Sequence, residues 1–142
     1  MSDDRPQATG TGVDLTVTVS CEPGLVPTLE ALVTRIGEYV GCASQTAQEV
    51  AQAVASVVQS ACESGHPSDA SRQMDVHFDG TDHLLRVDLT CRPPRPGDAT
   101  LQAAVTTSAG SARSSGLVDR AEVSTIDGCP SCRLTRQFRN AR

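Results

Sequence analysis

Residues 46–64, TAQEVAQAVASVVQSACES, decide the fold. Valine, alanine and cysteine recur at every third or fourth residue along this stretch, and polar side chains occupy most of the remaining positions. This period indicates an amphipathic helix that buries one face. Thr46 and Glu49 match a capping box, so we expect the helix to begin at Ser44 or Thr46. Because alanine is abundant, the helix can lie close to a sheet.

Strand patterns and a second helix surround this stretch. Val13–Ser20 alternates strictly between apolar and polar residues, as do residues 74–79 and 85–91. Alternation of this kind is typical of half-buried strands. Apolar residues recur at helical spacing over Leu25–Val40, and Gly41 is well placed to end that helix.

The C-terminal third predicts one more helix and two more strands. Asp98 can cap a short helix that runs through Val105, and the small residues of Ser108–Gly116 indicate a flexible segment. Strands are expected over Leu117–Ile126 and Cys132–Arg139. The order is then β-α-α-β-β-α-β-β, which predicts an α+β fold. We expect a two-layer α/β sandwich, with a mixed or antiparallel five-stranded sheet and helices on one face.

Length and composition are those of one globular domain. The 142 residues suit a single domain over residues 12–139, preceded by a disordered leader over 1–11 and followed by a short tail over 140–142. The start is acidic and polar, unlike a signal peptide, and no apolar run approaches the length of a membrane helix. We therefore expect a cytoplasmic protein that does not bind membranes.

The charge distribution argues against nucleic-acid binding. The formal net charge is −5, all 12 basic side chains are arginines, and aromatic residues make up 2% of the chain. An acidic body lacks the broad cationic surface that nucleic acids require, and few rings are available to stack on bases. The C-terminal edge is richer in arginine. A solvated strand face explains this feature, and a contact with an acidic partner is the alternative.

The six cysteines fall into two groups. Four of them occupy strand ends or apolar helix faces, one to each element, as expected of buried thiols: Cys21, Cys42, Cys62 and Cys91. Cys129-Pro-Ser-Cys132 is a CxxC motif, but zinc would need a second Cys or His pair, and the three histidines show no paired spacing. Because Asp127-Gly128 precedes the motif, we favour a structural hairpin turn. A redox or disulfide role for Cys129 and Cys132, or a metal site, remains an alternative.

Three segments, taken in this order, resemble a known family. The helix around Ala53–Cys62, the hairpin over Asp82–Leu89 and the closing segments over Gly116–Thr135 resemble the anti-sigma-factor serine kinases of the GHKL ATPase superfamily, which have the histidine-kinase-like ATPase fold. The likeness covers about residues 13–138. In that family the long second helix carries a Glu and an Asn four residues apart, which serve as general base and magnesium ligand.

This sequence departs from the family at each position that handles nucleotide. The resemblance places Ser56 and Ser60 where the family has its Glu and Asn. The adenine-reading Asp falls at Thr90 or Cys91, and the glycine-rich lid falls at residues 109–116, which hold two glycines. The resemblance therefore implies a degenerate member, a pseudo-ATPase or pseudokinase, with no catalytic residue, cofactor or metal.

We therefore expect a non-catalytic regulatory module that resembles a bacterial anti-sigma factor and sequesters or scaffolds a protein partner. The resemblance implies a sigma factor, a STAS-domain antagonist or another regulatory protein as that partner, and it leaves a homodimer open. The alternatives are a divergent ATP-binding serine kinase of the same superfamily and a thiol-based sensor through Cys129 and Cys132. The candidate partner-binding residues lie on the first helix and the last strand: Leu29, Leu32, Ile36, Arg133, Arg136 and Arg139.

Overall fold

The computed structural model describes residues 12–20, 22–63, 72–81, 83–92 and 98–139. Within these ranges the elements follow the order β1-α1-α2-β2-β3-α3-β4-β5, with one 3-10 turn at Pro23–Leu25 before α1. The predicted α+β class and element order are confirmed. The leader predicted over residues 1–11 and the tail predicted over 140–142 lie outside the described residues.

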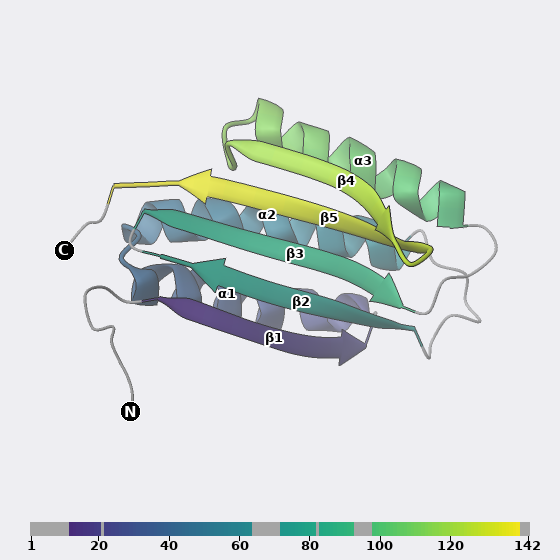
Figure 1. Cartoon of the computed structure of the whole chain (residues 1–142), viewed down its shortest axis with the longest axis horizontal. Coiled ribbons are helices and arrows are strands. Elements are labelled where there is room, and N and C mark those ends of the chain that lie inside the picture. The colour runs from purple at the N-terminus through teal and green to yellow at the C-terminus, as the bar shows by residue number, and fades with distance from the viewer. Residues whose placement is uncertain (1–11, 21, 64–71, 82, 93–97, 140–142) are drawn as a thin grey trace.

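The five strands form one sheet in the spatial order β1-β2-β3-β5-β4. Every neighbouring pair is antiparallel, so the sheet is antiparallel throughout. β1 and β4 are the two edge strands (Figure 1). The strands are β1 (Val13–Ser20), β2 (Gln73–Gly80), β3 (Leu84–Arg92), β4 (Arg120–Ile126) and β5 (Cys129–Gln137).

Three helices cover one face of this sheet, and the other face is open (Figure 1). They are α1 (Val26–Val40), α2 (Ser44–Glu63) and α3 (Asp98–Ser114). α2 contacts both other helices and is almost continuously buried on its inner side. Gly41, at φ 110°, ends α1 in the left-handed conformation that favours glycine.

The core lies between the helices and the inner face of the sheet. Alternate residues of β2 and β3 point into it, and Phe78 is fully buried there at 0% exposure. The close approach of α1 to α2 depends on Gly37, because a Cβ at this position would lie 2.8 Å from the Cβ of Ala47. Valine, leucine and alanine supply most of the remaining packing, as the scarcity of aromatic residues requires.

The predicted short third helix is wrong, because α3 continues to Ser114 and takes in most of the segment expected to be flexible. Leu101, Val105, Ala109 and Ala112 are buried on one face of this helix. The apolar period therefore runs past Val105, carried by alanines whose burial depends on the neighbouring helix. The small side chains of residues 108–114 therefore did not indicate a flexible segment.

Two local predictions are also corrected. α2 begins at Ser44, so Thr46 lies inside its first turn and is not the N-cap residue of a capping box. Glu49 instead lies 3.1 Å from the guanidinium of Arg136. The CxxC motif does not form the β4–β5 turn either. Asp127 and Gly128, with φ of 52° and 80°, make that turn, and the motif forms the first four residues of β5.

Candidate functional site

A polar groove lies between α2 and α3, at the place where the resemblance puts the nucleotide. Its volume is about 340 Å³. α2 contributes amides, hydroxyls and a carboxylate, and α3 and the residues after it contribute mainly hydroxyls. The lining residues are Gln52, Ser56, Gln59, Ser60, Glu63, Ser108, Ser111, Ala112, Ser115 and Leu117. Both helices present small side chains here, so a groove remains between them.

Ser56 and Ser60 both line this groove, as the helical spacing of four residues requires. Ser56 is exposed to solvent. The hydroxyl of Ser60 is hydrogen-bonded to the hydroxyl of Ser108 on α3. The hydroxyl of Ser60 therefore links α2 to α3.

Sequence reasoning missed Glu63, the one carboxylate among the described residues that line the groove. The amide Nε2 of Gln59 donates a hydrogen bond to Oε2 of Glu63 over 3.0 Å. These residues are four apart, like the polar pair of the kinases that the sequence resembles, but the carboxamide comes first in the chain. An exposed Gln–Glu pair at this spacing is also an ordinary helix-surface interaction. The spacing of four residues is the signal in the sequence that could have identified Gln59 and Glu63 as a candidate pair.

Cys91 lies in the core and does not face the groove. It is 3% exposed and packs among apolar residues of α2, α3 and the sheet, where the remaining space is about 10 Å³. Thr90 points to the opposite face of the sheet, and its hydroxyl lies 3.1 Å from that of Ser131. Cys91 therefore has no room for a base beside it, and Thr90 faces away from the groove between α2 and α3.

These groups do not fit a magnesium–nucleotide complex. Magnesium is bound by hard oxygen ligands, usually one or two carboxylates together with substrate phosphates. The two serines bring no carboxylate, and Glu63 is already hydrogen-bonded to Gln59. Within the described ranges, no three His, Cys, Asp or Glu side chains gather in a way that could hold a metal ion. Residues 109–114 of the lid segment belong to α3, and Ser108, which directly precedes the segment, is hydrogen-bonded to Ser60 on α2.

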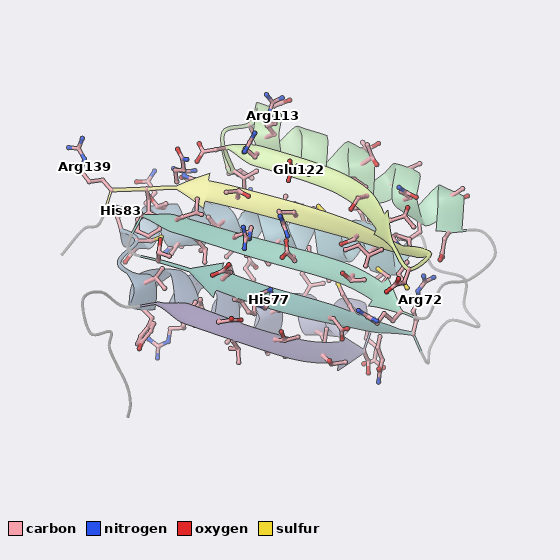
Figure 2. The ribbon with its side chains drawn as sticks, in the orientation of Figure 1. Arg72, His77, His83, Arg113, Glu122 and Arg139 are labelled. Atoms are coloured by element: carbon pink, nitrogen blue, oxygen red, sulfur yellow. The ribbon has the colours of Figure 1, made fainter. Side chains whose placement is uncertain are left out.

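The proposed partner-binding arginines have three different environments. Arg136 donates hydrogen bonds to the carbonyls of Gly116 and Leu117, each at 2.9 Å, and pairs with Glu49, so it joins the α3–β4 connection to α2. Arg133 is about half exposed and pairs with Asp88 through Nε at 2.7 Å. Arg139 is exposed, and Figure 2 shows it extending away from the end of β5.

The candidate apolar residues of α1 mostly face inward. Leu29 and Ile36 are 4% and 7% exposed and belong to the core, while Leu32 is partly buried against it. The structure brings none of these residues near Arg139 or Arg133 as a single surface. Of these three residues, only Leu32 keeps a partly exposed side chain that a partner could contact.

The two cysteines of the CxxC motif are free, buried thiols. Cys132 is 1% exposed, and burial raises its pKa to about 12, with a smaller contribution in the same direction from Asp88. Its thiolate is therefore strongly disfavoured, whereas a redox-active cysteine needs an accessible thiolate. Residues three apart on a strand also point to opposite faces, so this motif does not present two thiols together.

The open face of the sheet, which is turned toward the viewer in Figure 2, carries a row of charged side chains. Nε2 of His77 lies 2.6 Å from a carboxylate oxygen of Asp14, and Nδ1 lies 3.7 Å from one of Asp88. Asp88 in turn pairs with Arg133, which faces Glu122 on β4. The hydrogen bond with Asp14 is the main cause that raises the pKa of His77, and Asp88 adds to it. A hollow of about 500 Å³ lies over β3, β5 and β4 on this face.

Comparison with solved structures gives a match of fold. The chain superposes with a TM-score of 0.60 and 21% identity on the crystal structure of the RsbU and RsbW domains of Rv1364c from Mycobacterium tuberculosis. The match covers 92% of this chain and 33% of that chain, so the present chain spans one third of the longer protein. At this identity the likeness shows the fold alone.

The two comparisons of the sequence found no match. No protein-family model matches the chain, and no curated protein sequence matches it. In the part of the chain that the structure describes, no helix is both long enough and apolar enough to cross a membrane.

Proposed function

We propose that this domain is a non-catalytic regulatory module that binds a protein partner, as an anti-sigma factor does, with a sigma factor, a STAS-domain antagonist or a comparable regulator as that partner. The scaffold of a nucleotide-binding domain is kept, while the groups that would act on nucleotide are replaced. Binding a protein requires the scaffold and its surface but none of those groups.

One observation carries the proposal. The hydroxyl of Ser60, at the position that the resemblance assigns to a magnesium ligand, is hydrogen-bonded to Ser108 on α3. The segment that would form a mobile lid is part of the same helix, and Cys91 lies in a closed apolar environment. These features support a domain in which one position of the nucleotide site serves as a helix–helix contact beside the groove that remains.

A second candidate function is favoured by one specific feature. Gln59 and Glu63 supply a carboxamide and a carboxylate on the groove, four residues apart. A divergent ATP-binding kinase could use such a displaced pair. We rank it second because a single carboxylate lies among the groove's lining residues and its oxygen is already hydrogen-bonded.

Calorimetry with magnesium–ATP separates the two candidates. We expect no binding heat from the full chain at nucleotide concentrations up to about 1 mM, near the weak end of measurable affinity. The matched variant S56E/S60N installs the carboxylate and carboxamide of the related kinases and controls for the ability to detect binding. Micromolar binding by the unmodified chain, lost in Glu63→Gln, would contradict our proposal and support the kinase.

The regulatory role is tested with purified candidate partners. Sigma factors and STAS-domain proteins encoded by the same genome are mixed with the chain and separated by size exclusion. We expect a complex with at least one of them that survives chromatography, as interfaces of about 1,200–2,000 Å² generally do. Hydrogen exchange should then show the protected surface, with Arg133 and Arg139 as first candidates. If no candidate binds at about 50 μM, well above the Kd of such interfaces, the role is rejected.

A further inference from the structure

β4 forms the rim of the sheet opposite β1, and its outer side pairs with no strand among the described residues. The strand spans Arg120–Ile126 and contains neither proline nor glycine. α3 contacts β4, and Figure 1 shows the helix running beside it and beyond the rim of the sheet. An edge strand presents unpaired N–H and C=O groups, which can bind another strand. A strand added to β4 would therefore have α3 behind it.

Apolar side chains on both faces of β4 are incompletely covered. On the outer face, Ile126 is 47% exposed. On the inner face, Ala121 and Val123 are only partly buried against the core. A strand added at this edge would shield all three side chains from water, which favours association.

The hollow on the open face of the sheet reaches this edge. It is lined by Glu122, Ser124 and Ile126 of β4, together with Asp88 of β3 and Arg133 of β5, and its other lining residues are uncharged. Arg133 pairs with Asp88 at 2.7 Å and lies directly across from Glu122. Two carboxylates here share one guanidinium, which leaves one negative charge in excess. Figure 2 shows Glu122 on this strand, where a basic side chain from an added strand would balance that charge.

The two charged residues of β4 determine which strand it can accept. Arg120 and Glu122 are two residues apart, so both lie on the outer face. Charges on an edge discourage unselective pairing, but they stabilise a strand that carries opposite charges directly across from them. A second copy of β4, antiparallel and centred on Val123, would place Arg120 opposite Ile126. It would also leave Glu122 opposite Ser124, so the charge pattern favours a different sequence over a second copy.

We propose that β4 accepts an extended segment of a partner protein as a sixth, antiparallel strand of the sheet. The segment carries a basic side chain opposite Glu122, an acidic one opposite Arg120 and an apolar one opposite Ile126. This inference rests on the proposed function, because it requires a protein partner. In strand addition of this kind, backbone hydrogen bonds supply affinity and alternate side chains supply selectivity.

A synthetic peptide tests the surface without any knowledge of the partner. The probe is capped at both ends and has seven residues, the length of β4. From its N-terminus it carries valine, threonine, threonine, valine, arginine, valine and glutamate, which places the arginine opposite Glu122 and the glutamate opposite Arg120. The matched control peptide has the arginine and the glutamate exchanged, so its composition and net charge are the same.

Nuclear magnetic resonance of the isotopically labelled full chain measures the binding and locates it. We expect shift changes of the β4 amides that saturate with a Kd of about 1 mM or tighter. The control peptide should bind at least about tenfold more weakly, because it places like charges directly opposite one another. The chain variant R120E/E122R should reverse this preference. Equal binding of the two peptides, shift changes centred on β1 or on the α2–α3 groove, or no shift changes at about 2 mM would overturn the proposal.

A separate measurement distinguishes this inference from the proposed function. Complexes with sigma factors or STAS-domain proteins are formed with the unmodified chain and with R120E/E122R. We expect the variant to bind the partner at least about tenfold more weakly, because a segment that suits β4 then meets like charges. A complex that forms equally well with R120E/E122R would overturn the β4 surface and leave the proposed function standing.

Discussion

The ion pair between Arg72 and Asp98 offers the sharpest test of how α3 is held. Arg72 directly precedes β2, and Asp98 is the first residue of α3. The guanidinium donates two hydrogen bonds to the carboxylate, at 2.7 and 2.9 Å. The two side chains are 3% and 15% exposed, so little solvent screens the pair. The pair thus joins the start of α3 to the start of β2, across 26 residues of chain.

Arg72→Met should destabilise the protein by about 3–5 kcal/mol, because the largely buried carboxylate of Asp98 would lose its bidentate contact with the guanidinium. With a urea m-value of about 2 kcal/mol per molar, the unfolding midpoint should fall by about 1.5–2.5 M. Most of this cost belongs to the carboxylate that loses the guanidinium. The double variant R72M/D98L should therefore recover much of it, losing only about 1 kcal/mol of interaction with the helix N-terminus.

Urea unfolding followed by circular dichroism measures these differences, and hydrogen exchange should show α3 losing protection first. Arg92→Met is the matched control. Arg92 pairs with Asp75 at a similar distance of 2.7 Å, but its side chain is 52% exposed, so its removal should cost less than about 1 kcal/mol. Equal effects of the two single variants, or a double variant as unstable as Arg72→Met, would refute the reasoning.

Three further outcomes are expected. The pKa of His77 is raised above its ordinary value of 6.5, first by the hydrogen bond with Asp14 and also by Asp88. The contribution of His77 to stability is therefore complete below about pH 6.5 and is lost as the pH rises through its higher pKa in the folded protein. Urea unfolding midpoints measured between pH 5 and 8 should show this decline, and His77→Gln should flatten it. Gly41→Ala should cost about 1–2 kcal/mol in thermal unfolding because φ is 110° there, and a neutral result would contradict the left-handed helix end. The thiol of Cys132, whose pKa is raised to about 12, should resist alkylation at pH 8 until the chain is unfolded; rapid labelling of the native protein would revive the thiol-sensor alternative.

Much of the fold could be predicted because its signals are local. The strict alternation of Val13–Ser20 gave the bounds of β1, and Gly41 ended α1 as predicted. In both cases the determining factor is the period of side chains along a few neighbouring residues, or the conformational freedom of one glycine. Neither depends on what lies elsewhere in the chain.

The length of α3 could not be predicted from such local signals. Its last two turns bury only Ala109 and Ala112, whose small side chains give a weak apolar period among serines, threonine and glycine. Their burial depends on α2 lying alongside. The CxxC motif was misplaced for a similar reason, since a turn at Asp127-Gly128 fixes the register of β5 and takes Cys129 into the strand.

By itself, the sequence determined the element order, the buried face of each element and the absence of a carboxylate at Ser56 and Ser60, since each of these follows from residue type and near-neighbour spacing. Only the tertiary structure decided that Ser60 bonds to Ser108, that Glu63 lines the groove and that β1 and β4 lie at opposite ends of the strand order. These facts depend on contacts between residues far apart in the chain. Such contacts arise when helices and strands pack to bury apolar surface, and no local pattern encodes which polar groups that packing brings together.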